Sequence, residues 1–225
     1  MRTHTGVVPS PTARIAMSDE QRRVVFMAAS LLLDYPDERW QSIVDAVSLQ
    51  VNALPKKTKQ HFVRFLTAAQ VMGRRGMEQH YVECFDQRRR CSLFLSYYAV
   101  GDTRQRGAAI LAFQESLETL GFFLDREELP DHLCVVLEVA AKAKSSAHHV
   151  ATDMLAAHRD GIEVLRVALE HLDSPYSGLV AAVCSALPDI DEDTRHNFVD
   201  LIRSGPPAEL IGIESPLPFP TASNV

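Results

Sequence analysis

Histidine and cysteine are the residue types in this sequence that could bind a metal ion, and the chain contains nine histidines and four cysteines. His149 and Asp153 are four residues apart and could share one face of a helix. However, the sequence has no H-E-x-x-H motif and no Cys/His cluster at the spacing of a zinc site. This pattern favours solvated helix faces, so we predict no metal ligands.

Two cysteines lie in a setting that could activate a thiol. Cys84 and Cys91 flank the arginine run at residues 88–90, and nearby cations lower the pKa of a thiol. Only His80 is close to them in the sequence, so buried thiols of an apolar core are the competing interpretation. The four cysteines form no C-x-x-C pair, and without an export signal we expect free thiols. Since no Gly-rich phosphate loop is present either, we predict no catalytic residues.

The stretch from residue 81 to residue 107 carries the most chemical information. Its sequence, YVECFDQRRRCSLFLSYYAVGDTRQRG, combines five arginines with several aromatic residues. Five guanidinium groups cannot all be buried without partners, and nearby carboxylates can pair with some of them. One interpretation is an internal salt-bridge network that ties two helices together. The other is a groove that receives an anionic group or a polar peptide.

This stretch resembles the signature of the assembly chaperone of respiratory nitrate reductase, which is also called its delta subunit. A second match, at residues 128–133, is similar to the E-x-P-D-H motif of the wider group of chaperones for molybdenum oxidoreductases. The helix that ends in LLLDYP at residues 31–36 also fits, and the resemblance covers roughly residues 20–190. It implies that the partner-binding residues are Tyr81, Phe85, Asp86, Arg88, Arg89, Arg90, Tyr97, Tyr98, Asp102, Arg104, Arg106, Glu128, Pro130, Asp131 and His132.

The resemblance also implies a function, and it implies that the chaperone holds no cofactor permanently. Such chaperones bind the apo form of the catalytic (alpha) subunit in the cytoplasm, notably its N-terminal segment. They hold the subunit competent for insertion of the molybdenum cofactor and delay its docking to the membrane subunit. The alternatives are a general helical adaptor that binds peptides without a maturation role and an enzyme that acts through Cys84 or Cys91.

The Glu128–His132 motif has two interpretations of its own. Pro130 suits the first turn of a helix, and Asp131 would then meet the positive end of the helix dipole. A cation is disfavoured at that end, so His132 should be neutral there. Either the motif only starts a helix, or Asp131 and His132 face a groove beside a hinge near residues 122–130.

The apolar residues repeat at helical spacing through most of the chain, which predicts an all-α, single-domain bundle of roughly eight to ten helices. The bundle could consist of two halves joined by the hinge. Ser18 and Gln21 form a capping box that starts a helix through Leu33, and Pro36 opens a second helix. The other predicted helices carry residues 62–72, 81–85, 103–121, 130–140, 150–172, 176–187 and 191–204.

The ends of the chain and its charge complete the prediction. Residues 1–17 are expected to form a disordered leader, residues 18–204 the helical domain, and residues 205–225 a proline-rich tail. The formal net charge of −6 argues against nucleic-acid binding. No apolar run is long enough for a membrane span or a secretory signal. We therefore expect a soluble, cytoplasmic protein that is a monomer or a weak homodimer.

Overall fold

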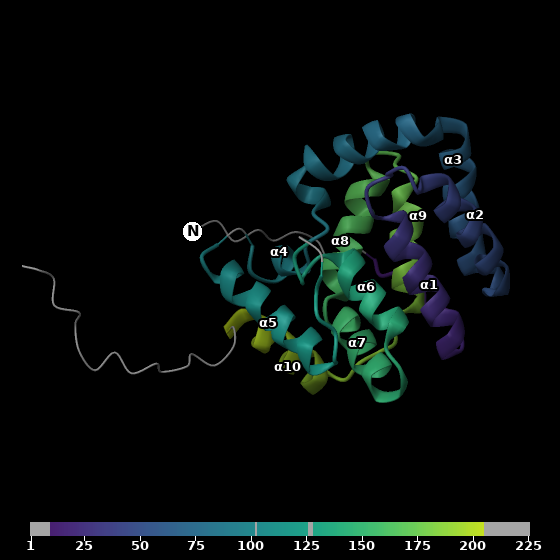
Figure 1. The fold of residues 1–225 in the computed structure, drawn as a ribbon. Helices are drawn as coiled ribbons and strands as arrows, with labels where there is room; N and C mark the ends of the chain where they lie inside the picture. Colours follow the sequence, from purple (N-terminus) through teal and green to yellow (C-terminus); the bar gives the residue numbers. More distant parts are fainter. Residues whose placement is uncertain (1–9, 102, 126–127, 205–225) are drawn as a thin grey trace, which may run out of the picture.

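The computed structural model describes residues 10–101, 103–125 and 128–204, and these residues form ten α-helices (Figure 1). Within them, the β pairing is a single bridge between Phe94 and His132, which confirms the all-α prediction. The helices are α1 (Asp19–Leu32), α2 (Trp40–Gln50), α3 (Lys56–Tyr81), α4 (Leu95–Val100), α5 (Gln105–Thr119), α6 (Leu133–Lys142), α7 (Ser145–Ala157), α8 (Arg159–Glu170), α9 (Tyr176–Ala186) and α10 (Glu192–Ser204).

Helix α9 forms the centre of the core. Nine of its eleven residues are buried, so it is apolar around its whole circumference, as expected for a helix surrounded by others. It packs against α1, α3 and α8, while α6 lies against α1 and α7. Figure 1 shows α3 arching over one end of this group.

A second group of helices lies beside the first. Helix α5 packs against α4 and α10, and Figure 1 shows α5 and α10 side by side. The connector at 122–130 leads from this group into α6. Its residues 126–127 lie outside the described residues, and the hinge at this connector stays a prediction.

Two helices begin later than the prolines that were predicted to open them. Helix α2 begins at Trp40, because Asp37 first makes a turn in which its carbonyl accepts from the Trp40 N–H at 3.1 Å. Helix α6 begins at Leu133, and His132 is its N-cap. The prediction that places Asp131 in the first turn of this helix is therefore wrong.

The predicted long helix over residues 150–172 is also wrong, since α7 and α8 are separate. The break lies at His158, whose backbone is non-helical (φ −96°, ψ 11°) and whose buried ring packs on Phe113 at 5.2 Å. Gly161 is needed for packing, because a Cβ there would lie 2.6 Å from the Cβ of Tyr98 on α4. Val150 was predicted on the inner face and is instead exposed.

The third helix is predicted to end near residues 73–76, but it is only kinked there. At Gly73 the backbone leaves helical geometry (φ 66°, ψ 172°), a conformation that glycine adopts without steric cost. Beyond this kink α3 continues to Tyr81, and a π-helical turn over Val82–Asp86 follows directly. After the kink and the π-helical turn, the chain continues from Tyr81 and Phe85 into the arginine-rich stretch.

Part of the predicted leader, residues 10–17, lies against α8 and α9. The Ile15 N–H donates to the carbonyl of Ser185 at 2.9 Å, and the Thr12 N–H donates to Glu163 Oε1 at 2.6 Å. We call residues 10–17 the strap. Residues 1–9 and the predicted tail at 205–225 lie outside the described residues.

Candidate partner-binding site

The two stretches that the sequence analysis singled out meet in space. Residues 93–95 lie antiparallel to residues 131–133, where the Leu95 N–H donates to the Asp131 carbonyl at 2.9 Å. In return, the Leu133 N–H donates to the Leu93 carbonyl at 2.7 Å. These main-chain bonds fix the arginine-rich stretch against the Glu128–His132 motif.

A groove of about 340 Å³ opens where the two stretches meet. Its volume lies within the range of roughly 300–1,000 Å³ that is typical of ligand pockets. Three arginines and two carboxylates share its lining with aromatic rings. The lining residues are Tyr81, Phe85, Asp86, Arg88, Arg89, Ser92, Leu93, Phe94, Tyr97, Arg106, Glu128 and His132.

One wall of the groove is an aromatic cluster. The rings of Tyr81 and Phe85 lie 4.8 Å apart, and the Phe85 ring meets the buried ring of Tyr176 edge-on at 4.9 Å. Tyr176 in turn contacts Phe65, whose ring lies at 5.2 Å. The apolar part of the groove therefore rests directly on the core.

Another part of the groove lining combines a cation with two rings. The Arg106 guanidinium carbon lies 5.0 Å from the centroid of the Phe94 ring, which is within the range of a cation–π contact. The Phe94 ring also meets the His132 ring edge-on at 5.1 Å. Phe94 was missed by sequence reasoning, although its position between the buried Leu93 and Leu95 could have indicated that it points outward.

Several predicted residues lie outside the groove lining. The Tyr98 hydroxyl donates a hydrogen bond to the Ser92 carbonyl at 2.8 Å, so this side chain supports the loop at Ser92. Arg90 and Arg104 are exposed, and Pro130 is buried. Asp102 lies outside the described residues.

Asp131 is fully buried (0% exposed) beneath the groove and accepts a hydrogen bond from the Ser96 hydroxyl through Oδ2. Burial raises the pKa of its carboxyl group, and the Ser96 hydrogen bond and the Arg106 charge only partly offset this. Its Oδ1 has no hydrogen-bond partner among the described residues. Asp131 therefore positions the motif from within the core.

His132 lies at the border between the core and the groove. Its Nδ1 accepts from the Cys134 N–H at 3.3 Å, which caps α6. Burial lowers the pKa of the imidazole, against the charges of Glu128, Asp34 and Asp131. The neutral imidazole that the sequence predicted is thus favoured, with desolvation as its main cause.

The structure also brings together Cys84 and a histidine. Cys84 Sγ lies 3.4 Å from His80 Nε2, which itself lies 2.8 Å from the Ser174 hydroxyl. Burial raises the pKa of the thiol and lowers the pKa of the imidazole. Both effects oppose the thiolate–imidazolium pair that a cysteine nucleophile uses. The four cysteines are free and buried, which confirms the prediction of free thiols.

The described residues also bear on metal binding and on membrane insertion. No three His, Cys, Asp or Glu side chains in residues 10–101, 103–125 and 128–204 gather closely enough to hold a metal ion. Across the same ranges, none of the helices combines the length and the apolar character that a membrane span requires.

Comparison with known families gives one clear match. The model of the nitrate reductase delta subunit family matches residues 51–182, which is more than half of the chain. The matched region contains the groove lining and the core helix α9 up to Ala182.

Individual relatives point to the same family. A Bacillus subtilis protein named "Probable nitrate reductase molybdenum cofactor assembly chaperone NarJ" is 29% identical over 175 residues, covering 77% of this chain and 94% of its own. The nitrate reductase molybdenum cofactor assembly chaperone NarJ of Escherichia coli is 32% identical over 127 residues, or 55% of this chain and 53% of its own. The nitrate reductase-like protein NarX of Mycobacterium tuberculosis is 34% identical over 161 residues, 72% of this chain but 24% of its own.

Proposed function

This chain belongs to the nitrate reductase delta subunit family, and we propose that it is a dedicated assembly chaperone of a respiratory nitrate reductase. It binds the apo catalytic subunit of that enzyme through the subunit's N-terminal segment. It holds the subunit competent for insertion of the molybdenum cofactor, in the cytoplasm and before the subunit docks at the membrane. The chaperone itself performs no catalysis, and the cofactor belongs to its client.

The observation that carries this proposal is the meeting of the two motifs in one groove. Residues 81–106 and 128–132 are far apart in the sequence, yet both line the same cavity. Its aromatic wall can bury apolar side chains of a peptide, while Arg88, Arg89 and Arg106 can pair with its carboxylates or carbonyl groups. The two lining carboxylates, Asp86 and Glu128, can receive its cations or N–H groups. Such a lining suits an amphipathic peptide segment better than a uniformly charged ligand.

The first prediction concerns the arginines of the groove. We expect Arg89→Ala to weaken capture of a synthetic peptide that carries the N-terminal segment of the catalytic subunit, by about tenfold or more. Losing one partner of a desolvated charge pair at an interface costs about 2–5 kcal/mol. The binding constant can be measured by isothermal titration calorimetry.

Arg75→Ala is the matched control, because Arg75 and Arg89 are both exposed but only Arg89 lines the groove. We expect a loss of less than about threefold for this variant, since a charge that stays in solvent when the peptide binds contributes about 0–1 kcal/mol. Both variants should melt close to the wild-type protein. Equal losses for the two arginines, or an early melting transition of Arg89→Ala with normal peptide binding, would contradict the groove.

The second prediction separates the two roles of His132. Replacement by alanine removes the N-cap of α6, which costs about 0.5–2 kcal/mol of stability. Replacement by asparagine restores a side chain that caps helices well. We expect both His132→Ala and His132→Asn to lower nitrate reductase activity in cells, but only His132→Ala to lower the melting temperature.

The pH dependence of these variants provides a control. The pKa of His132 is lowered in the folded state, so its contribution to stability is complete above the unfolded pKa and decreases as the pH falls through the folded pKa. His132→Asn should therefore lose less stability than the wild-type protein when the pH falls below about 6.5. If His132→Asn matures the reductase as well as the wild-type protein, then His132 is only a helix cap.

A further inference from the structure

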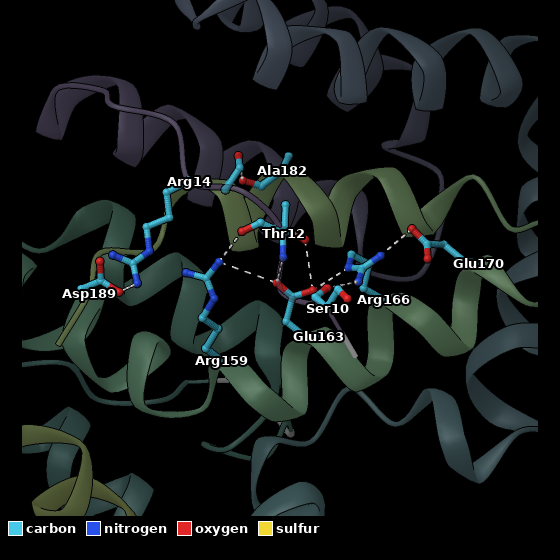
Figure 2. A network of polar contacts seen from close by, with 10 residues as sticks. Ser10, Thr12, Arg14, Arg159, Glu163, Arg166, Glu170, Ala182 and Asp189 are labelled. Atoms are coloured by element: carbon cyan, nitrogen blue, oxygen red, sulfur yellow. Dashed lines mark hydrogen bonds and ion pairs between the residues drawn. The ribbon is translucent and has the colours of Figure 1, made fainter. Parts of the chain in front are cut away.

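A cluster of polar side chains on α8 contacts the strap beside α9, and none of these side chains lines the groove (Figure 2). The strap occupies the site that these side chains form. Arg159 Nη2 donates to the Thr12 carbonyl at 2.6 Å, and Arg166 Nη2 donates to the Ser10 carbonyl at 3.2 Å. Glu163 accepts the Thr12 N–H at 2.6 Å and the Thr12 hydroxyl at 3.0 Å. Side chains of α8 thus bind both hydrogen-bond donors and hydrogen-bond acceptors of the strap.

Most of these bonds involve the main chain of the strap. The contacts of Ser10, Thr12 and Ile15 just described use backbone N–H and carbonyl groups, which a segment of different sequence also offers. Two contacts depend on side chains: the Thr12 hydroxyl on Glu163 and the ion pair of Arg14 with Asp189. The site therefore fits a non-helical segment with a small hydroxyl residue and a cation two positions further on.

With the strap in place, the polar groups below it are buried. Glu163 is 2% exposed and Arg159 is 7% exposed, whereas Ser10, Pro11, Ala13, Arg14 and Ala16 of the strap are exposed. Arg159 Nη1 is buried and has no hydrogen-bond partner among the described residues. A segment that places a carboxylate or a carbonyl beside this nitrogen would make a bond that the strap does not make.

The strap is an N-terminal segment that a limited set of polar contacts holds in place. Ordering eight residues costs conformational entropy at each of them, and here it is offset by a small number of hydrogen bonds and by partial burial of Ile15 and Met17. Terminal segments with few buried contacts open with less free energy than global unfolding requires, so we expect the strap to open locally.

From these observations we propose that the site on α8 binds a non-helical peptide segment of another protein, and that the strap occupies it in cis until that segment arrives. A second copy of this chain is a poor donor of the segment. The Ile15 contact lies only three residues before the Ser18 N-cap of α1, and Arg22 on α1 binds the Ala186 carbonyl at 3.0 Å. A strap from a second copy would therefore bring its own α1 onto the place that α1 already fills.

The test uses the full-length protein and a fluorescent peptide with the sequence of residues 9–17, PSPTARIAM. Thr12→Pro removes the N–H that binds Glu163 and should release the strap. Ser10→Pro is the matched control, because Ser10 contributes its carbonyl to Arg166 and proline retains that carbonyl. By fluorescence anisotropy, we expect the Thr12→Pro protein to bind the peptide at least tenfold more tightly than the wild-type and Ser10→Pro proteins, in which the strap competes at a high effective concentration.

The same titration includes a peptide that carries proline at the position of Thr12, which should not bind the Thr12→Pro protein. Binding of both peptides with equal affinity, or of neither peptide to a folded Thr12→Pro protein, would overturn the proposal. A second measurement needs no variant: the amides of Thr12 and Ile15 should exchange hydrogen with solvent faster than the amides of α9. Exchange as slow as that of α9, or loss of the native fold in Thr12→Pro, would identify the strap as a fixed part of the core.

Discussion

Replacement of Tyr176 by alanine should destabilise the protein by about 3–5 kcal/mol, which is typical when a large buried aromatic side chain is removed. Tyr176 is fully buried (0% exposed) at the start of α9. Its ring packs against Phe65 and Phe85 and stacks on the His80 imidazole at 5.8 Å with an interplanar angle of 2°. The free energy of unfolding can be measured by urea denaturation followed by circular dichroism.

Tyr176→Phe is the matched variant and should be at least as stable as the wild-type protein. The Tyr176 hydroxyl is buried and has no hydrogen-bond partner among the described residues. A buried hydroxyl without a partner costs about 1–3 kcal/mol on protein mutational scales, so its removal should not destabilise the fold. A large loss of stability in Tyr176→Phe would mean that the hydroxyl has a partner, such as a bound water.

The same residue connects stability to function. Phe85 rests on Tyr176 and lines the groove, so a cavity at Tyr176 removes support from the aromatic wall. Peptide capture by Tyr176→Ala should therefore be weaker even at temperatures where the variant is folded, and capture by Tyr176→Phe should be normal. Core packing and binding are in this way coupled through one ring contact.

The features of the fold that are encoded locally could be predicted from the sequence. Ser18 and Gln21 are three residues apart and form the capping box of α1 by bonding to each other's backbone. The helical periodicity likewise follows from the spacing of apolar residues. The break at His158 could not be predicted, because it depends on two contacts between distant parts of the chain. The His158 ring packs on Phe113, and Tyr98 lies close to Gly161. These residues are distant in the sequence.

For the candidate site too, the local motifs could be predicted from the sequence and the long-range contacts could not. The resemblance identified both motifs, but only the fold reveals that Phe94 pairs with His132 and that Asp131 lies beneath the groove. The strap is a further case. Pro9 and Pro11 indicate an irregular segment, and nothing local indicates that the Thr12 amide finds a buried carboxylate on α8. Long-range hydrogen bonds of this kind leave no periodic pattern in the sequence.

Replacement of Glu163 by alanine should also cost about 3–5 kcal/mol, the range observed when one partner of a buried charge pair is removed. The Glu163 side chain is 2% exposed and receives Arg166 Nε at 2.5 Å, with Arg159 Nη2 at 3.7 Å. Without this carboxylate, two largely buried guanidinium groups face each other without their shared counter-charge. The Thr12 N–H loses its acceptor as well.

Glu170→Ala is the control, because Glu170 pairs with the same arginine at 2.6 Å but its side chain is 50% exposed. An exposed pair contributes about 0–1 kcal/mol, since solvent screens both charges. Thermal unfolding of the two variants should therefore differ several-fold in the stability lost, although each removes one carboxylate from Arg166. Glu163→Gln should lie between them, because an amide oxygen can still accept the Thr12 N–H but carries no charge. If Glu163→Ala and Glu170→Ala destabilise the protein equally, the network beside α8 is solvated, and the buried carboxylate is not what holds the strap.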